Sequence, residues 1–141
     1  MLSNGTAINI RERAIPSPKI LLVDDDHDLV RGLELRLRVN NYEVVAAGDA
    51  YAAITSTQKE RPDLIILDIG LPDGDGFVVL DRLHKLGYLS TVPVIVLTSR
   101  DQATFEQLAL KAGATAFFQK PADNNELLKA IRLSLNPAGN A

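Results

Sequence analysis

Short aliphatic runs alternate with helix-like segments along most of this chain. Helical spacing of apolar residues predicts helices at 27–40, 49–59, 75–87, 101–113 and 123–135. Strands are predicted between them, at 19–23, 42–47, 63–68, 92–99 and 114–119. The first, third and fourth of these are unbroken aliphatic runs, which are typical of strands buried on both faces. The pattern therefore predicts an α/β domain with a doubly wound, five-stranded parallel sheet.

The two ends of the chain lack this alternation. Residues 1–17 mix polar, basic and apolar side chains without a clear period, so a flexible tail is expected there. A short docking helix through Ile8, Ile10 and Ile15 is the alternative. The domain itself is expected over residues 18–136. Residues 137–141 fit either a C-terminal tail or the start of a linker, which leaves open whether the protein stands alone.

In the predicted helix at 101–113, Phe105, Leu108 and Ala112 are expected on one face, and Gly113 is expected to end the helix. Aspartates stand where other helices are expected to begin. Asp49 is the expected N-cap of the second helix, and Asp123 with Glu126 has the spacing of a capping box.

Composition narrows the classes of function. The 141 residues suit one domain, and a net charge of -3 gives no electrostatic basis for direct nucleic-acid binding by it. The chain has no cysteine, and its two histidines, His27 and His84, lie far apart, so thiolate and zinc sites are not expected. No apolar run approaches the ~20 residues of a membrane span, and no signal peptide is evident. A cytoplasmic protein without membrane association is expected.

Polar residues stand at the ends of four of the five predicted strands, at the edge where doubly wound sheets bind ligands. They are Asp24, Asp25 and Asp26 at the end of the first strand, Asp68 at the third, Thr98 at the fourth and Lys120 at the fifth. If the first and third strands are neighbours, their carboxylates converge, and two carboxylates ~4 Å apart repel by roughly 4 kcal/mol at an effective dielectric near 20. A hard divalent cation relieves this repulsion, and Mg²⁺ suits carboxylate and phosphate oxygens.

Asp68 combines a rigid position with the chemistry of a nucleophile towards phosphorus. We expect its carboxylate to be exposed at the end of the central strand rather than buried. Lys120 could place a point charge on a phosphoryl oxygen, and Thr98 could donate a hydrogen bond to another. Each residue alone has an ordinary explanation as a cap, a turn or a solvated charge. Their coincidence at one edge favours a phosphoryl-transfer site.

Four segments resemble the receiver domain of two-component response regulators, similar to the stand-alone chemotaxis receiver. They are ILLVDDD, LIILDIGLPDGDG, VIVLTS and AGATAFFQKP, and they fall in the family's order and spacing over about residues 18–136. The resemblance implies a flavodoxin-like (βα)5 fold with strand order 2-1-3-4-5. It also implies a signalling domain that catalyses its own phosphorylation and dephosphorylation, rather than an enzyme that turns over a substrate.

The resemblance further implies roles for individual residues. These are the phosphoacceptor Asp68; the Mg²⁺ ligands Asp24, Asp25, Asp68 and the carbonyl of Gly70; the switch residues Thr98 and Phe117; and the phosphoryl-binding Lys120. Pro121 is implied to follow Lys120 through a cis peptide bond. Pro72 and Gly76 match loop residues after the phosphoacceptor, whereas Asp73 and Asp75 are expected to be turn and cap residues.

The chain departs from the family at several positions near this site. Ala122 stands where an aromatic residue is common, and Leu71 where methionine is common. Gly70 has no side chain to reach into the site, and Arg100 lies two residues after Thr98. In the family, side chains at these last two positions tune the rates of phosphorylation and hydrolysis, so the lifetime of the phosphoryl group is left open.

The resemblance implies a sensor histidine kinase, a histidine phosphotransfer protein or acetyl phosphate as the phosphodonor. Thr98 then moves towards the phosphoryl group and Phe117 turns inward, which changes the surface formed by the fourth helix, fifth strand and fifth helix. A downstream protein or an attached effector domain is implied to read this surface. A homodimer formed on phosphorylation is a further implied partner.

Three other functions account for part of the pattern. A phosphatase of the haloacid-dehalogenase type needs its nucleophile after the first strand and a cap insertion, for which the chain is too short. A flavin or nucleotide binder needs a phosphate loop where this chain has an acidic triplet. A degenerate receiver that acts as a constitutive interaction module is disfavoured by the intact set of acids, threonine and lysine.

Overall fold

A computed structural model of the protein describes residues 17–72 and 76–137. Five parallel strands form one sheet in the order β2-β1-β3-β4-β5, which confirms the predicted doubly wound fold. The strands are β1 (Lys19–Val23), β2 (Glu43–Ala47), β3 (Leu64–Leu67), β4 (Val94–Thr98) and β5 (Ala116–Gln119). The helices are α2 (His27–Val39), α3 (Ala50–Glu60), α4 (Gly76–Lys85), α5 (Gln102–Lys111) and α6 (Asn124–Leu135), with a short 3-10 helix, η1 (Tyr88–Ser90), before β4.

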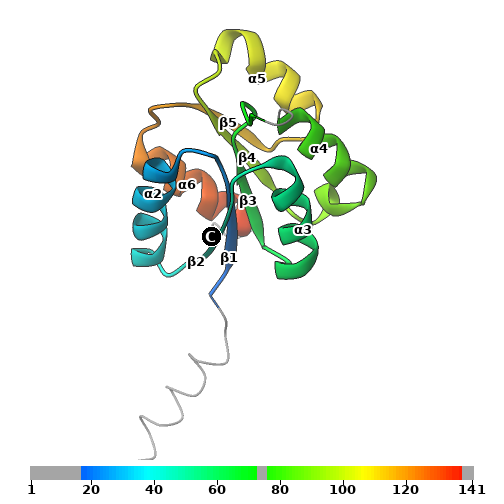
Figure 1. The fold of residues 1–141 in the computed structure, drawn as a ribbon. Helices are drawn as coiled ribbons and strands as arrows, with labels where there is room; N and C mark the ends of the chain where they lie inside the picture. Colours follow the sequence, from blue (N-terminus) through cyan, green and yellow to red (C-terminus); the bar gives the residue numbers. More distant parts are fainter. Residues whose placement is uncertain (1–16, 73–75, 138–141) are drawn as a thin grey trace, which may run out of the picture.

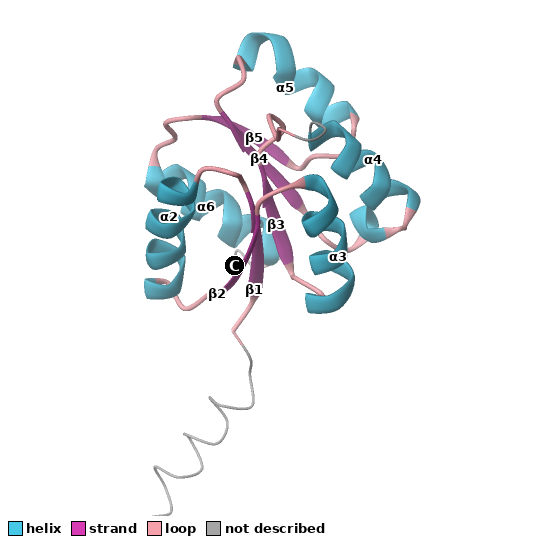
Figure 2. Ribbon diagram, viewed as in Figure 1, coloured by secondary structure: helices cyan, strands magenta, loops and turns pink. Residues whose placement is uncertain are grey.

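The helices cover both faces of the sheet. Figure 1 shows α2 and α6 on one side of the strands and α3 and α4 on the other, and Figure 2 shows the same layers by element type. Every residue of β3 is buried, because Leu64 and Ile66 point into the α2–α6 side and Ile65 and Leu67 into the α3–α4 side. This two-sided burial explains why the central strand reads as an unbroken aliphatic run.

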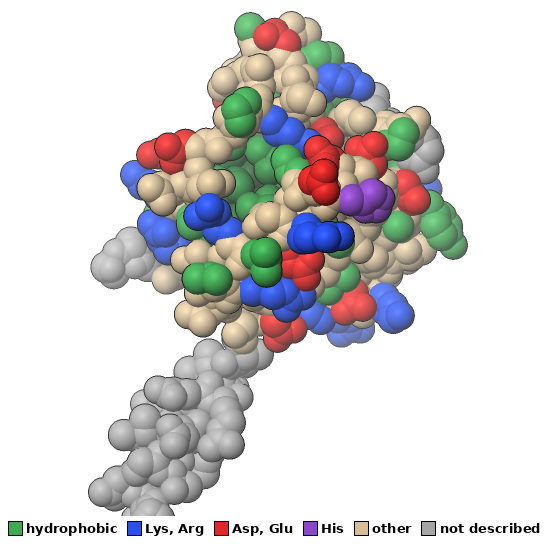
Figure 3. Space-filling view, turned by 60° about the vertical axis from the view of Figure 1, so that its left-hand side comes forward, with side chains coloured by type: hydrophobic (Ala, Val, Ile, Leu, Met, Phe, Trp, Pro, Cys, Tyr) green, Lys and Arg blue, Asp and Glu red, His purple; other side chains and the backbone are tan. Residues whose placement is uncertain are grey.

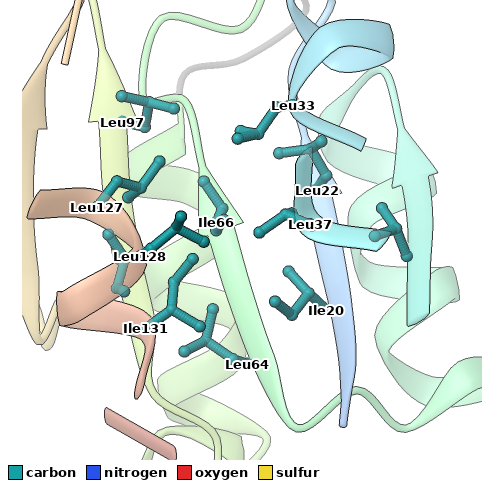
Figure 4. Close-up of a cluster of buried hydrophobic side chains, with 12 residues drawn as sticks. Ile20, Leu22, Leu33, Leu37, Leu64, Ile66, Leu97, Leu127, Leu128 and Ile131 are labelled. Carbon is teal, nitrogen blue, oxygen red and sulfur yellow. The ribbon is translucent and has the colours of Figure 1, made fainter. Parts of the chain in front are cut away.

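The core on the α2–α6 side is drawn in Figure 4. Leu33 and Leu37 of α2 and Leu127, Leu128 and Ile131 of α6 pack over the strands. Their spacing of three or four residues places them on one face of each helix, as the sequence pattern predicts. Among the described residues, no helix combines the length and the apolar content that crossing a bilayer requires.

Aspartate side chains begin four of the helices. Asp26, Asp49, Asp101 and Asp123 each accept a hydrogen bond from the backbone N–H three residues later. Such bonds satisfy helix N–H groups that have no partner within the helix. The N-caps expected at Asp49 and Asp123 are therefore confirmed. Asp73 and Asp75, the expected turn and cap residues before α4, lie outside the described residues.

Helix α5 buries few of its apolar residues. Ala109 is the buried residue among those of α5, and Phe105 and Ala112 are partly buried. Leu108, which was expected on one face with Phe105 and Ala112, is 52% exposed. The helix therefore turns a small residue into the core and leaves a large one in contact with water.

Gly76 begins α4 in close contact with the end of β3. A Cβ atom at Gly76 would lie 2.5 Å from Cα of Ile69 and 2.7 Å from the carbonyl oxygen of Asp68, and both are backbone atoms. The Gly76 N–H also donates to the carbonyl of Ile69 at 2.9 Å. Helix α4 therefore starts against the backbone that follows the central strand.

We expect Gly76→Ala to lower the free energy of unfolding by about 1–3 kcal/mol, because the backbone of Asp68 and Ile69 cannot move away freely. Gly32→Ala is the matched control within α2, since nothing lies within 4 Å of the added Cβ there. That control should raise stability by about 0.5–1 kcal/mol through helix propensity. Urea unfolding measures both changes, and equal effects of the two substitutions would contradict the close contact at Gly76.

Candidate functional site

Four of the predicted site residues meet at the C-terminal edge of the sheet. The ammonium of Lys120 lies 2.8 Å from Oδ2 of Asp24 and 3.4 Å from Oδ2 of Asp68. On the other side of Asp68, the Thr98 hydroxyl donates to Oδ1 at 2.7 Å. The Asp68 carboxylate is thus held between a lysine and a threonine that come from two different strands.

Backbone hydrogen bonds at the strand ends fix these positions. The Asp24 N–H donates to the carbonyl of Ala47, and the Asp68 N–H donates to the carbonyl of Val23. The Lys120 N–H similarly donates to the carbonyl of Thr98 at 2.7 Å. The pairing of parallel strands thus continues one residue past each of β1, β3 and β5, so these residues belong to the rigid sheet rather than to loops.

An acidic cluster gives the site its charge. Asp24, Asp25 and Asp68 each offer a carboxylate oxygen, and these atoms lie within 4.8 Å of one another. Asp24 and Asp68 are buried while Asp25 is exposed, so the cluster is enclosed on one side and open to water on the other. Three hard oxygen donors with an open side could hold a metal ion, and they suit Mg²⁺, which keeps some of its waters.

Asp68 is buried, with 6% of its surface exposed, so the prediction of an exposed carboxylate was wrong. Ile69 and Leu71, which follow it in the chain, are buried as well. Burial is tolerated because Oδ1 accepts hydrogen bonds from the Thr98 hydroxyl and from the Gly70 N–H. Among the described residues, no buried side-chain nitrogen or oxygen lacks a hydrogen-bond partner.

Burial and pairing act differently on the two charges of the Asp24–Lys120 ion pair. Burial raises the pKa of Asp24 above its ordinary value, and the hydrogen bonds from Lys120 and from the Asp26 N–H only partly offset this. Burial lowers the pKa of Lys120, but the hydrogen bond to Asp24 and the charges of Asp68 and Asp24 outweigh it, so the pKa is raised overall. The charged form of Lys120 is thus stabilised by two carboxylates, whereas Asp24 and Asp68 share a single lysine as their positive partner.

The two predicted switch residues, Thr98 and Phe117, are both buried. Thr98 is fully buried while its hydroxyl bonds to Asp68, and Phe117 is 6% exposed. Phe117 packs in a cluster with Ile69 and Val96. The Thr98 hydroxyl is thus bonded to Asp68 while the Phe117 ring is buried, and the switch role of both residues stays a prediction. Neighbouring Phe118 packs partly buried on the α2–α6 side of the sheet.

Arg100 lies next to the space that Gly70 leaves. Its Nε is 3.3 Å from the position that a Cβ at Gly70 would take, and Oδ1 of Asp68 is 3.4 Å from the same point. The guanidinium also lies over the ring of Phe105, with 5.4 Å between its central carbon and the ring centroid. The absence of a side chain at Gly70 thus lets Arg100 approach the site.

A hollow of about 360 Å³ lies beside Lys120 between α2 and α6. Its apolar lining includes Leu29, Leu33, Leu97 and Ala122, and Figure 3 shows a recess with hydrophobic side chains on this side of the molecule. Ala122 stands in this lining where the resemblance leads one to expect an aromatic ring. The preceding Lys120–Pro121 peptide bond is cis, as the resemblance implied.

The model of the response regulator receiver domain family matches residues 20–132 of the chain. The chain belongs to this family. It is therefore a receiver domain of two-component signalling systems, which is a signalling domain rather than a classical enzyme. The matched residues include the whole acidic cluster together with Thr98 and Lys120.

Similar proteins agree with this assignment. Transcriptional regulatory protein PrrA of Mycobacterium tuberculosis is 36% identical over 128 residues, which cover 91% of this chain and 54% of PrrA. A CheY-like receiver domain protein of Methanospirillum hungatei has 30% identity and a TM-score of 0.79, with 86% of this chain and 95% of that chain covered. The BeF3-activated N-terminal receiver domain of Klebsiella pneumoniae RstA has 30% identity and a TM-score of 0.78, with 84% and 98% covered. The chain thus spans about half the length of the curated relatives, and nearly the whole of the receiver structures.

The receiver's Thr98–Asp68 hydrogen bond should be visible as a coupling energy. We expect Thr98→Val to lower stability by about 1–3 kcal/mol, because a buried carboxylate loses a donor. In an Asp68→Ala background, the same substitution should cost far less. Urea unfolding of the two single variants and the double variant measures the difference. Thr98→Ser, which keeps the hydroxyl, is the control, and a coupling energy near zero would contradict the bond.

The raised pKa of Asp24 predicts a pH-dependent gain in stability for Asp24→Asn. At pH 7 without divalent cations, this variant should be more stable than the wild type, because a neutral amide is less costly to bury than a carboxylate. The gain should shrink as the pH falls through the raised pKa towards 3.8, since wild-type Asp24 then binds a proton. Chemical unfolding between pH 7 and pH 4 tests this. The exposed cap variant Asp123→Asn should show little change, and a destabilised Asp24→Asn at pH 7 would refute the prediction.

Proposed function

We propose that Asp68 is the phosphoacceptor of this receiver and that a phosphohistidine is its donor. A sensor histidine kinase or a histidine phosphotransfer protein would present that group, and acetyl phosphate could replace it. The observation that carries this proposal is the Asp68 carboxylate held between the Thr98 hydroxyl and the Lys120 ammonium. Both groups are hydrogen-bond donors, and both stand where phosphoryl oxygens on Asp68 would need them.

In the proposed transfer, a carboxylate oxygen of Asp68 forms a bond to phosphorus while the bond from phosphorus to the donor nitrogen breaks. The electron pair of the broken bond returns to the leaving imidazole. Lys120 and Thr98 then donate hydrogen bonds to the new phosphoryl oxygens. Mg²⁺, when held by Asp24, Asp25, Asp68 and the carbonyl of Gly70, would supply neutralisation of the phosphoryl charge.

A structural change caused by phosphorylation of Asp68 would pass to the surface through β4 and β5. Thr98 ends β4, and Phe117 on β5 shares a buried cluster with Ile69 after β3 and Ala109 on α5. A shift of Thr98 towards a phosphoryl group would therefore be felt by the surface of α5, β5 and α6. We propose that partners read this surface.

A relative supports a proposal for the partners of that surface. Transcriptional regulatory protein PrrA is about twice as long as its match to this chain. An attached effector domain or a separate downstream protein is therefore the proposed reader, and a homodimer formed on phosphorylation is a further partner. We place the receiver at residues 18–136 and in the cytoplasm, with residues 1–17 and 137–141 as its flanks.

The phosphorylation itself has a direct test. Incubation with acetyl phosphate and Mg²⁺ should add one phosphoryl group by intact mass, and omission of Mg²⁺ should strongly reduce the adduct. Asp68→Asn should abolish it, because an amide is a poor nucleophile. The control Asp81→Asn changes an exposed ion pair with Lys85 and should leave the adduct intact. A folded wild type that gains no adduct, and does not respond to beryllofluoride, would exclude this function.

A further inference from the structure

The Thr98 hydroxyl is oriented by the loop that follows it. It accepts a hydrogen bond from the backbone N–H of Arg100 at 3.2 Å and donates its single proton to Asp68 at 2.7 Å. A hydroxyl has one donor, so an acceptor contact on one side leaves its proton for the other side. The position of the loop 99–101 therefore decides whether the hydroxyl points at Asp68.

Gln119 holds the far end of this loop. The backbone N–H of Gln102, the first residue of α5, donates to Oε1 of Gln119 at 2.8 Å. This N–H is one of the groups that a helix start leaves without an internal partner. The local cap Asp101 instead accepts hydrogen bonds at Oδ2 from the N–H and the hydroxyl of Thr104. A side chain 17 residues away thus completes the start of α5.

Gln119 also stands between two groups of the phosphorylation site. It is the last residue of β5, and it pairs with Thr98 of β4 in the sheet register. The next residue along the chain is Lys120, whose ammonium contacts Asp24 and Asp68. One side chain therefore connects the first turn of α5 to the strand ends that carry the threonine and the lysine.

The hydrogen bond from Gln102 to Gln119 matters because α5 has few buried residues that hold it against the sheet. Among its residues Ala109 is the buried one, whereas α6 buries Leu127, Leu128 and Ile131. Figure 1 shows α5 at the top of the view, beyond the pairs of helices that flank the sheet. A helix with little buried apolar surface depends more strongly on individual polar contacts for its position.

We propose that Gln119 is a positioning residue of the receiver site: its side chain holds the start of α5, and through residues 99–101 it holds the Thr98 hydroxyl on Asp68. The link between α5 and Thr98 is a property of the fold. Its effect on phosphoryl transfer rests on the proposed function. Movement of α5 and reorientation of the Thr98 hydroxyl are then two aspects of one change.

The test compares three variants of the full chain. Gln119→Met keeps the length of the side chain but loses the acceptor, and Gln119→Glu keeps an acceptor oxygen. Gln107→Met makes the same chemical change at another exposed position, on α5 itself. Gln119 is exposed, so all three variants should fold.

The first measurement is amide hydrogen exchange by NMR, without any phosphodonor. In Gln119→Met, the Gln102 amide should exchange about fivefold faster, as expected when one hydrogen bond of ordinary net strength is lost. The Arg100 amide, which donates to Thr98, should also exchange faster. Gln119→Glu should restore both rates, and Gln107→Met should change neither. A Gln102 amide unaffected by Gln119→Met would overturn the proposal, and so would an Arg100 amide that keeps its wild-type rate.

The second measurement is the initial rate of phosphorylation by acetyl phosphate at saturating Mg²⁺. Gln119→Met should slow it about threefold or more, because the donor to Asp68 is less well positioned. Faster exchange at Arg100 with an unchanged phosphorylation rate would show that Gln119 serves the helix and not the reaction. If the wild type itself accepts no phosphoryl group, the proposed function fails, while the exchange experiment still decides whether Gln119 holds Thr98.

Discussion

Two carboxylates buried at the edge of a sheet and sharing one lysine form the interaction on which the rest of the site depends. Asp24 and Asp68 repel each other, and Lys120 offsets that repulsion from a strand two positions away from β3 in the sheet. Such an arrangement is stable only while all three residues stay in register, since a buried charge that loses its partner is costly. The sheet therefore holds two carboxylates close together, and a bound cation or phosphoryl group would change the balance of charge at its edge.

Among the described residues, only a few side chains connect the carboxylates at the sheet edge to the surface around α5. Thr98 carries a donor and an acceptor contact on one oxygen, so it belongs at once to the carboxylate and to the loop that leads into α5. Phe117 connects the same strands through packing rather than through hydrogen bonds. The polar contacts and the apolar contacts both lead to α5, which has the fewest buried residues of the described α-helices. A helix held by few buried residues is expected to move more easily than the others.

The fold and the meeting of the site residues could be predicted from the sequence because both follow from strand order. Aliphatic runs mark β1 and β3, which Asp24 and Asp68 follow directly, and Lys120 directly follows β5. Features that depend on side-chain packing were not predictable in this way. The burial of Asp68 depends on how its hydrogen-bond partners enclose it, and the exposure of Leu108 depends on the rotation of α5. In the sequence, Gln119 is an ordinary polar residue at the end of a strand. Its role as acceptor for the Gln102 N–H becomes visible only when α5 is placed beside β5.

The two-sided burial of β3 also constrains how this family of sequences can vary. Leu64, Ile65, Ile66 and Leu67 are all aliphatic, so exchanging them between the two cores would change packing only modestly. Deleting any one of them, however, would draw Asp68 back by one residue, about 3.3 Å, and turn it to the opposite face of the sheet. Over evolutionary time, substitutions within this strand should therefore be tolerated while insertions and deletions are eliminated. The position of the Asp68 carboxylate therefore depends more on the number of residues in β3 than on which aliphatic residues they are.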